Sequence, residues 1–185
     1  AGAGAGADAD PAADPVARLR ALQSERHPEG TPEERVAQLG LELDGRVPTN
    51  PQGIYHPVVL VGNLAYVSGQ IPRNPDGSLV TGVVGTAGAD EERGREAATA
   101  VGLTMLATLR SQLGSLDRVK RVVKVSAFVA SAPDFERQPA VCNALSELLI
   151  DVFGPAGKSS RSAVGVAALP LGISVEAEAL VEIEP

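Results

Sequence analysis

The sequence is poor in the residues that build disulfides, metal sites and aromatic cores. Among its 185 residues it has one cysteine, Cys142, two histidines, no tryptophan and only 3% aromatics. A single cysteine excludes an intrachain disulfide, which fits a reducing compartment. The two histidines, His27 and His56, have no cysteine at ligand spacing, so we expect neither a metal nor an organic cofactor. With 44% hydrophobic residues, the core must be built from Val, Leu, Ile and Ala.

Positive charge is also scarce. The chain has 16 lysines and arginines against 23 aspartates and glutamates, a formal net charge of −7 at pH 7. An acidic protein repels a phosphate backbone, and the few aromatic rings offer little stacking for single strands. The one basic run, from Arg118 to Lys124, fits a helix end followed by a solvated strand edge. We therefore expect no nucleic-acid partner.

Long apolar runs are absent as well. No run is long enough to span a bilayer, and the sequence does not open on a charged and then apolar signal segment. We therefore expect a soluble, cytoplasmic protein without a membrane partner. Residues 1–30 are expected to form a low-complexity, disordered tail, with a candidate short helix over Val16–Glu25. Residues 31–185 are expected to form one domain, whose core begins at about residue 55.

Turn and cap signals predict the first elements of this domain. Thr31–Glu34 has a threonine N-cap, a proline at the first helical position and acids in the first turn, so a short helix should follow. Gly62-Asn63 is a hairpin turn signal between two strand-like runs, Val58–Val61 and Leu64–Ser68. A further short strand is predicted over Leu79–Val84.

Hydrophobic periodicity predicts the later elements. Two helices are expected over Asp90–Leu113 and Pro139–Phe153, with a strand over Arg118–Val129 between them. Together with the strands before and after, this is an α+β domain with a mostly antiparallel sheet. Two helices on one face would leave the other face of the sheet uncovered by its own chain. Such a face seldom stays exposed, so we expect an oligomer.

The stretch from Arg161 to Glu182 alternates as two strands around a Leu-Pro-Leu-Gly corner. Because strand side chains alternate between faces, Val164 lies on the face opposite to Arg161 and Ala163. If the valines of both runs pack into the core, Arg161 and Glu176 share the other face. Arginine's planar fork suits a carboxylate or phosphate, so that face is expected to bind a ligand or a subunit. The alternative is a strand-end arginine in a surface ion pair.

Three motifs occur in a fixed order along the chain: SGQIP at Ser68–Pro72, RSAVGVAALP at Arg161–Pro170 and VEAEALVEI at Val175–Ile183. With a hairpin before them and helices between them, they resemble the Rid family, also called the YjgF family. The resemblance implies a chorismate-mutase-like fold, whose sheets form the inner barrel of a homotrimer with clefts between neighbouring subunits. It also implies hydrolytic deamination of reactive 2-imino or 2-enamino acids to 2-keto acids and ammonia.

The same resemblance implies roles for individual residues. Arg161 would hold the substrate carboxylate, and Glu176 would position water and move a proton. Four further residues match positions that line the cleft: Tyr55, Ser68, Asn143 and Ala163.

Plainer interpretations remain open for these residues. Glu176 could pair with a charge across a subunit contact, and Tyr55 could anchor a loop. Ser68 could cap a strand end, and Asn143 could satisfy backbone groups at an interface. Cys142 is expected to be a buried small hydrophobe rather than a nucleophile, because no histidine is placed to act as its base.

The sequence also departs from the family pattern. Ala163 stands where many family deaminases have a cysteine, and the smaller side chain would widen the cleft. Gln138–Val141 resembles an insertion that lengthens the loop before the second long helix. The missing cleft cysteine and the longer N-terminal region favour an alternative, a non-catalytic trimer that binds a small carboxylate metabolite as a sensor or pathway accessory. RNA cleavage, which is attached to the family by name, is disfavoured by the acidic charge and the few aromatics.

Overall fold

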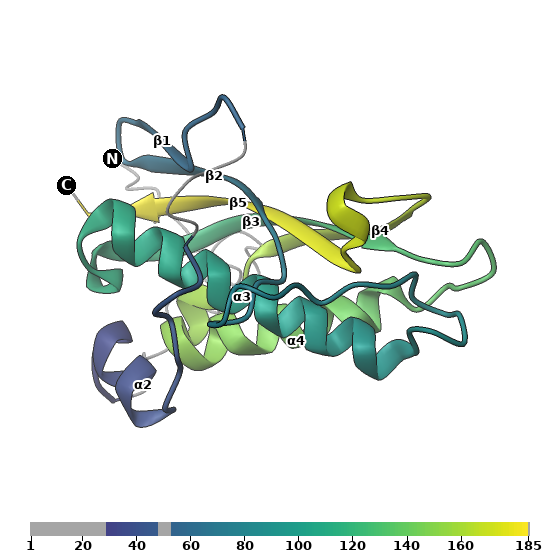
Figure 1. Ribbon diagram of the computed structural model, residues 1–185. Coiled ribbons are helices and arrows are strands. Elements are labelled where there is room, and N and C mark those ends of the chain that lie inside the picture. Colours follow the sequence, from purple (N-terminus) through teal and green to yellow (C-terminus); the bar gives the residue numbers. More distant parts are fainter. Residues whose placement is uncertain (1–28, 48–52, 185) are drawn as a thin grey trace, which may run out of the picture.

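The computed structural model describes residues 29–47 and 53–184, which fold into a sheet covered by helices (Figure 1). The candidate helix at 16–25 and most of the expected tail lie outside these residues. Within them, five strands form one sheet in the order β1-β2-β5-β3-β4. The strands are β1 Val58–Val61, β2 Leu64–Gln70, β3 Val119–Ala130, β4 Ser160–Val166 and β5 Val175–Ile183. The predicted hairpin of β1 and β2 is confirmed.

The sheet is antiparallel except at one edge, where β4 runs parallel to β3. The two final strands therefore do not pair with each other, because β3 lies between β4 and β5. The predicted strand over Leu79–Val84 is wrong. That segment forms only isolated bridges, such as Thr81 with Ile173. Gly82 has a φ of +123°, which interrupts the extended backbone that a strand needs.

Three α-helices lie within the described residues: α2 Pro32–Gln38, α3 Glu91–Leu113 and α4 Gln138–Phe153. The helix start at Thr31 is confirmed as a reciprocal capping box with Glu34. Helix α3 ends at Gly114, whose φ of 84° is the left-handed conformation that glycine adopts readily. The interpretation of Gln138–Val141 as a loop insertion is wrong, because these residues form the first turn of α4.

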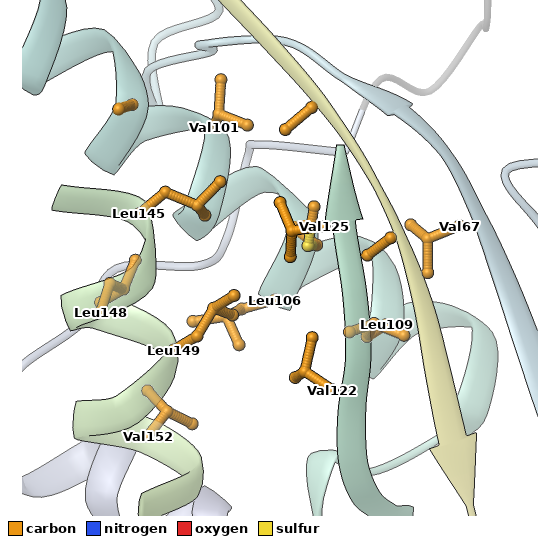
Figure 2. Close-up of a cluster of buried hydrophobic side chains, with 14 of the residues drawn as sticks. Val67, Val101, Leu106, Leu109, Val122, Val125, Leu145, Leu148, Leu149 and Val152 are labelled. Carbon is orange, nitrogen blue, oxygen red and sulfur yellow. The ribbon is translucent and has the colours of Figure 1, made fainter. Parts of the chain in front are cut away.

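Helices α3 and α4 lie side by side against one face of the sheet (Figure 1). Figure 2 shows Leu106 of α3 and Leu149 of α4 meeting Val122 and Val125 of β3 in a core of aliphatic side chains. The two helices approach closely at Gly102, where an added Cβ would lie 2.7 Å from Leu148 Cδ2. The α+β prediction, with its long helices on one face of the sheet, is thus confirmed.

Helix α2 contacts the C-terminal ends of α3 and α4. Arg35 is buried and donates from Nη1 to the carbonyl of Val152, at the end of α4, over 3.1 Å. Glu33 accepts from Arg110 Nε of α3 at 3.1 Å and from the backbone N–H of Leu116 at 2.9 Å. The N-terminal extension is therefore joined to the helix layer through charged and backbone groups.

Candidate functional site

The edge strand β4 presents Arg161 to the helix layer. Arg161 pairs with the buried Val125 in the register of β3 and β4, whereas Val164 pairs with Phe128. Directly paired residues of a sheet share a face, so Arg161 points to the side that α4 covers. Val164 points to the other side, which no described helix covers and which is called the uncovered side below, and it is 46% exposed. The prediction that the valines of this strand face the core is therefore wrong.

The Arg161 guanidinium is held by three oxygen atoms of α4. Nη1 donates to Ser146 Oγ at 2.9 Å, and Nη2 donates to Asn143 Oδ1 at 3.1 Å and to the carbonyl of Pro139 at 3.2 Å. The three acceptors are spaced four and three residues apart, so they lie on one side of the helix. Below, these residues with Arg161 are called the arginine cradle.

The cradle leaves the charge of Arg161 uncompensated. All three acceptors are neutral, and among the described residues Arg161 forms no ion pair with a carboxylate. A guanidinium has five N–H donors, and the cradle uses three of them. Two donors and the full positive charge remain to attract an anion such as a carboxylate. The surface ion pair considered as an alternative is not formed in the structure.

Small residues surround the cradle along β4. Ala163 lies on the same face as Arg161 and packs against the edge of the core. At Gly165, an added Cβ would lie 2.7 Å from Gln138 Nε2 and 2.8 Å from Ser131 Oγ. The Gln138 amide, which donates to the carbonyl of Phe135 at 2.6 Å, thus occupies the space that a larger residue would fill.

Cys142 is fully buried on α4 beside the cradle. Burial raises the pKa of its thiol to about 11, and the opposing effect of the Arg161 charge is smaller. The group is therefore a neutral thiol near pH 7, in agreement with its expected role as a small hydrophobe.

Glu176 lies on the opposite face of the sheet from Arg161. It pairs with Phe128 of β3, which also pairs with Val164, and both point to the uncovered side. The prediction that Arg161 and Glu176 share a face is therefore wrong. An added Cβ at the neighbouring Gly69 would overlap Glu176 Oε1, so a larger residue there would displace the flexible end of the Glu176 side chain. Burial, with a smaller contribution from Glu178, raises the pKa of Glu176.

Ser68 stands next to Gly69 on β2 and holds the loop before β1. Its Oγ donates to the carbonyl of His56 at 2.7 Å, and its backbone N–H donates to the carbonyl of Pro57 at 3.0 Å. Tyr55, in the same loop, is 56% exposed and lies over Gly53. Ser68 also lines a hollow of about 380 Å³ on the uncovered face of the sheet.

The expected site residues thus form two groups within one chain. Arg161, Asn143 and Ala163 lie where β4 meets α4, whereas Glu176 and Ser68 lie on the uncovered side of the sheet. Tyr55 is connected to the second group through the loop that Ser68 holds. Ser146 was not predicted, although it follows Asn143 by three residues and helical spacing alone would put both on one side of α4.

Two further findings concern metal sites and membrane spans among the described residues. They include no group of three or more His, Cys, Asp or Glu side chains that could hold a metal ion. None of their helices is both long and apolar enough to cross a membrane.

Comparisons with known proteins give consistent matches. Residues 47–183 match the family model described as Endoribonuclease L-PSP. Protein TCP17 of Trypanosoma cruzi is 43% identical over 147 residues, which cover 79% of this chain and 90% of that protein. A 2-iminobutanoate/2-iminopropanoate deaminase of Dermatophagoides farinae is 36% identical over 135 residues, which cover 72% of this chain and 89% of that enzyme.

The fold is shared with solved structures of similar sequence. The crystal structure of a protein of unknown function from Agrobacterium tumefaciens is 37% identical, with a TM-score of 0.73. The match covers 90% of this chain and 99% of that chain. The chain therefore belongs to the Endoribonuclease L-PSP family, which is the Rid or YjgF family.

Proposed function

We propose that this protein hydrolyses reactive 2-imino and 2-enamino acids to 2-keto acids and ammonia, with the substrate carboxylate held by Arg161. The observation that carries the proposal is the arginine cradle, in which neutral acceptors orient the guanidinium and leave its charge uncompensated. A related protein that is named as a 2-iminobutanoate/2-iminopropanoate deaminase supports this reaction class. The acidic net charge of −7 argues against RNA as the substrate.

The reaction requires a second copy of the chain. Arg161 and Glu176 lie on opposite faces of one sheet, so a single chain does not bring them to one substrate. Strand β4 is at the sheet edge, where another copy can approach Arg161. The uncovered face carries exposed apolar side chains, among them Tyr66 at 48% and Val164 at 46%, which favours contact between copies. We therefore propose a homotrimer whose clefts combine Arg161 of one subunit with Glu176 of the next.

The chemistry in such a cleft needs few groups. Arg161 neutralises the substrate carboxylate and orients the molecule. As water adds to the imine carbon, Glu176 accepts a proton from the water and then delivers it to the nitrogen. The carbinolamine collapses to release ammonia, so one water is consumed for each 2-keto acid formed. An enamine substrate first takes a proton on its β-carbon to become the imine. A carboxyl group with a raised pKa suits these transfers.

The test is ammonia release from 2-iminobutanoate and 2-iminopropanoate generated in situ. The wild type should accelerate release, and Arg161→Ala should lower kcat/KM by about 100-fold or more, because a charged hydrogen-bonded anchor is lost. Lys158→Ala is the matched control, since Lys158 is an exposed cation in the loop before β4 and should be dispensable. Full turnover by a folded Arg161→Ala protein contradicts the proposal.

One observation favours a second candidate, a non-catalytic carboxylate binder. Among the described residues, the hydrogen-bond partners of Arg161 are two neutral side chains and a backbone carbonyl, none of which titrates near pH 7, and the pKa of the Cys142 thiol is raised to about 11. If the subunits do not deliver Glu176 to the cradle, the site binds without turnover. This candidate predicts that 2-oxobutanoate raises the Tm of the wild type while ammonia release stays at background. Absence of any Tm shift counts against it.

A further inference from the structure

We propose that Ser146 is a positioning residue that sets the orientation of the Arg161 guanidinium. The inference rests on the proposed carboxylate binding by Arg161. Two of the three cradle contacts are made by Nη2, with Asn143 and Pro139, and the Ser146 hydroxyl is the acceptor for Nη1. Without this third contact, the planar group can swing about Nη2. The contact with Ser146 therefore sets the direction in which the remaining N–H donors of Arg161 point.

The serine sits on a rigid support. Its neighbours Leu145 and Leu149 are fully buried in the core, so α4 holds the Ser146 Oγ at a constant place relative to the sheet. Ser146 itself is only partly buried. Replacing it by alanine therefore opens no core cavity, and alanine has the higher helix propensity. A loss of affinity in this variant cannot be ascribed to a weakened fold if its Tm is unchanged or higher.

The neutrality of the hydroxyl is part of the role. A carboxylate at this position would form an ion pair with Arg161 and compete with an anionic ligand for its charge. Serine accepts the Nη1 hydrogen bond and leaves the charge available. We therefore expect Ser146→Asp to lose ligand binding even though its hydrogen-bond acceptor is retained. Ser146→Thr, which keeps both the hydroxyl and its neutrality, should restore binding.

The experiment measures the Kd of the full chain for 2-oxobutanoate by calorimetry, with steady-state deamination alongside. Ser146→Ala should raise Kd and KM about tenfold, with kcat changed less than about threefold, because one hydrogen bond to a charged group is lost. Ser146→Thr should stay within about threefold of the wild type, and Ser146→Asp should bind at least about 100-fold more weakly. The matched control is Ser111→Ala, on an exposed site of α3, which should change nothing.

A second readout separates this inference from the proposed function. In NMR spectra of arginine-labelled protein, the Nη1 protons of Arg161 should give signals separate from those of Nη2, and in Ser146→Ala the Nη1 signals should shift and broaden because their acceptor is lost. Failure of both wild type and Arg161→Ala to bind 2-oxobutanoate overturns the carboxylate-binding function, and the NMR comparison then decides the role of Ser146 alone. Identical Arg161 signals in wild type and Ser146→Ala, or an unchanged Kd in Ser146→Ala when wild type binds, overturns the positioning role.

Discussion

At the scale of single residues, charge is distributed unequally between the two parts of the proposed cleft. Arg161 keeps an available positive charge because its partners on α4 are neutral. Glu176 is disfavoured as an anion because it is partly buried and lies near Glu178. The Arg161 charge can bind the carboxylate of an anionic imine, and the Glu176 carboxyl can exchange a proton with the reacting atoms. The two groups would therefore be complementary parts of one site.

The raised pKa of Glu176 predicts a pH-dependent effect of Glu176→Gln on stability. A group whose pKa is higher in the folded state contributes stability below its unfolded pKa, and this contribution is lost as pH rises through the folded value. The Tm of Glu176→Gln relative to wild type should therefore increase from pH 4 to pH 8, as measured by thermal unfolding at several pH values. Glu136→Gln, at an exposed position in the turn before α4, is the control and should show no such trend. A difference that is constant across this range contradicts the prediction.

At the scale of elements, the short helix α2 depends on its contacts for its position. Seven residues are too few for an isolated helix to be stable in water, even with a capping box. The hydrogen bond from Arg35 to the Val152 carbonyl places a cation at the C-terminal end of α4, where the helix dipole favours it. The contacts of Glu33 with Arg110 and Leu116 attach the other side of α2.

We expect Arg35→Met to destabilise the protein by about 1.5–3 kcal/mol, because a buried carbonyl loses a charged donor. The measurement is the free energy of unfolding from urea titration. Arg93→Met is the control, since Arg93 forms an exposed i,i+3 ion pair with Glu96 that should contribute less than about 0.5 kcal/mol. Equal losses for the two variants would show that α2 is not anchored through Arg35. The proposed deaminase activity, measured per folded molecule, should be unchanged because α2 lies away from the cradle.

At the scale of the whole molecule, the uncovered sheet face and the edge position of β4 both favour assembly. The side chains of Val59, Tyr66 and Val164 are exposed on strands β1, β2 and β4. Contact between copies would remove these apolar groups from water. It is also the step that the proposed chemistry needs, because one sheet separates Arg161 from Glu176.

A shared cleft predicts complementation between two inactive variants. Arg161→Ala and Glu176→Gln should each lose deamination, but subunits mixed from both should recover it. In an equal mixture about one quarter of the clefts combine an intact arginine with an intact glutamate, if subunits mix at random. The measurement is ammonia release after the subunits are dissociated and reassembled together. Separately reassembled variants are the control, and no recovery in verified mixed oligomers would mean that both residues act from one subunit.

Local signals in the sequence were sufficient for most elements of the fold. Thr31 and Asp90 cap α2 and α3, and Gly114 ends α3, as their residue types predict. The hairpin at Gly62-Asn63 and the strand over β3 also follow from patterns that span only a few residues. The helix predicted from Pro139 is confirmed as α4, but Gln138–Val141 was also interpreted as lengthening the preceding loop, whereas these residues form the first turn of α4.

The arrangement of the candidate site was decided by the tertiary structure. Alternation along β4 predicts that Arg161 and Ala163 share a face, but it does not determine which face is covered, because that depends on β3 and α4. The same limit explains why the prediction that Arg161 and Glu176 share one face of the sheet is wrong. The sequence by itself determined most of the elements and indicated the candidate site residues, since these depend on short-range periodicity and residue type. Only the packing of β4 beneath α4 decided that Ser146 meets Arg161 and that Glu176 lies across the sheet, since both are long-range contacts.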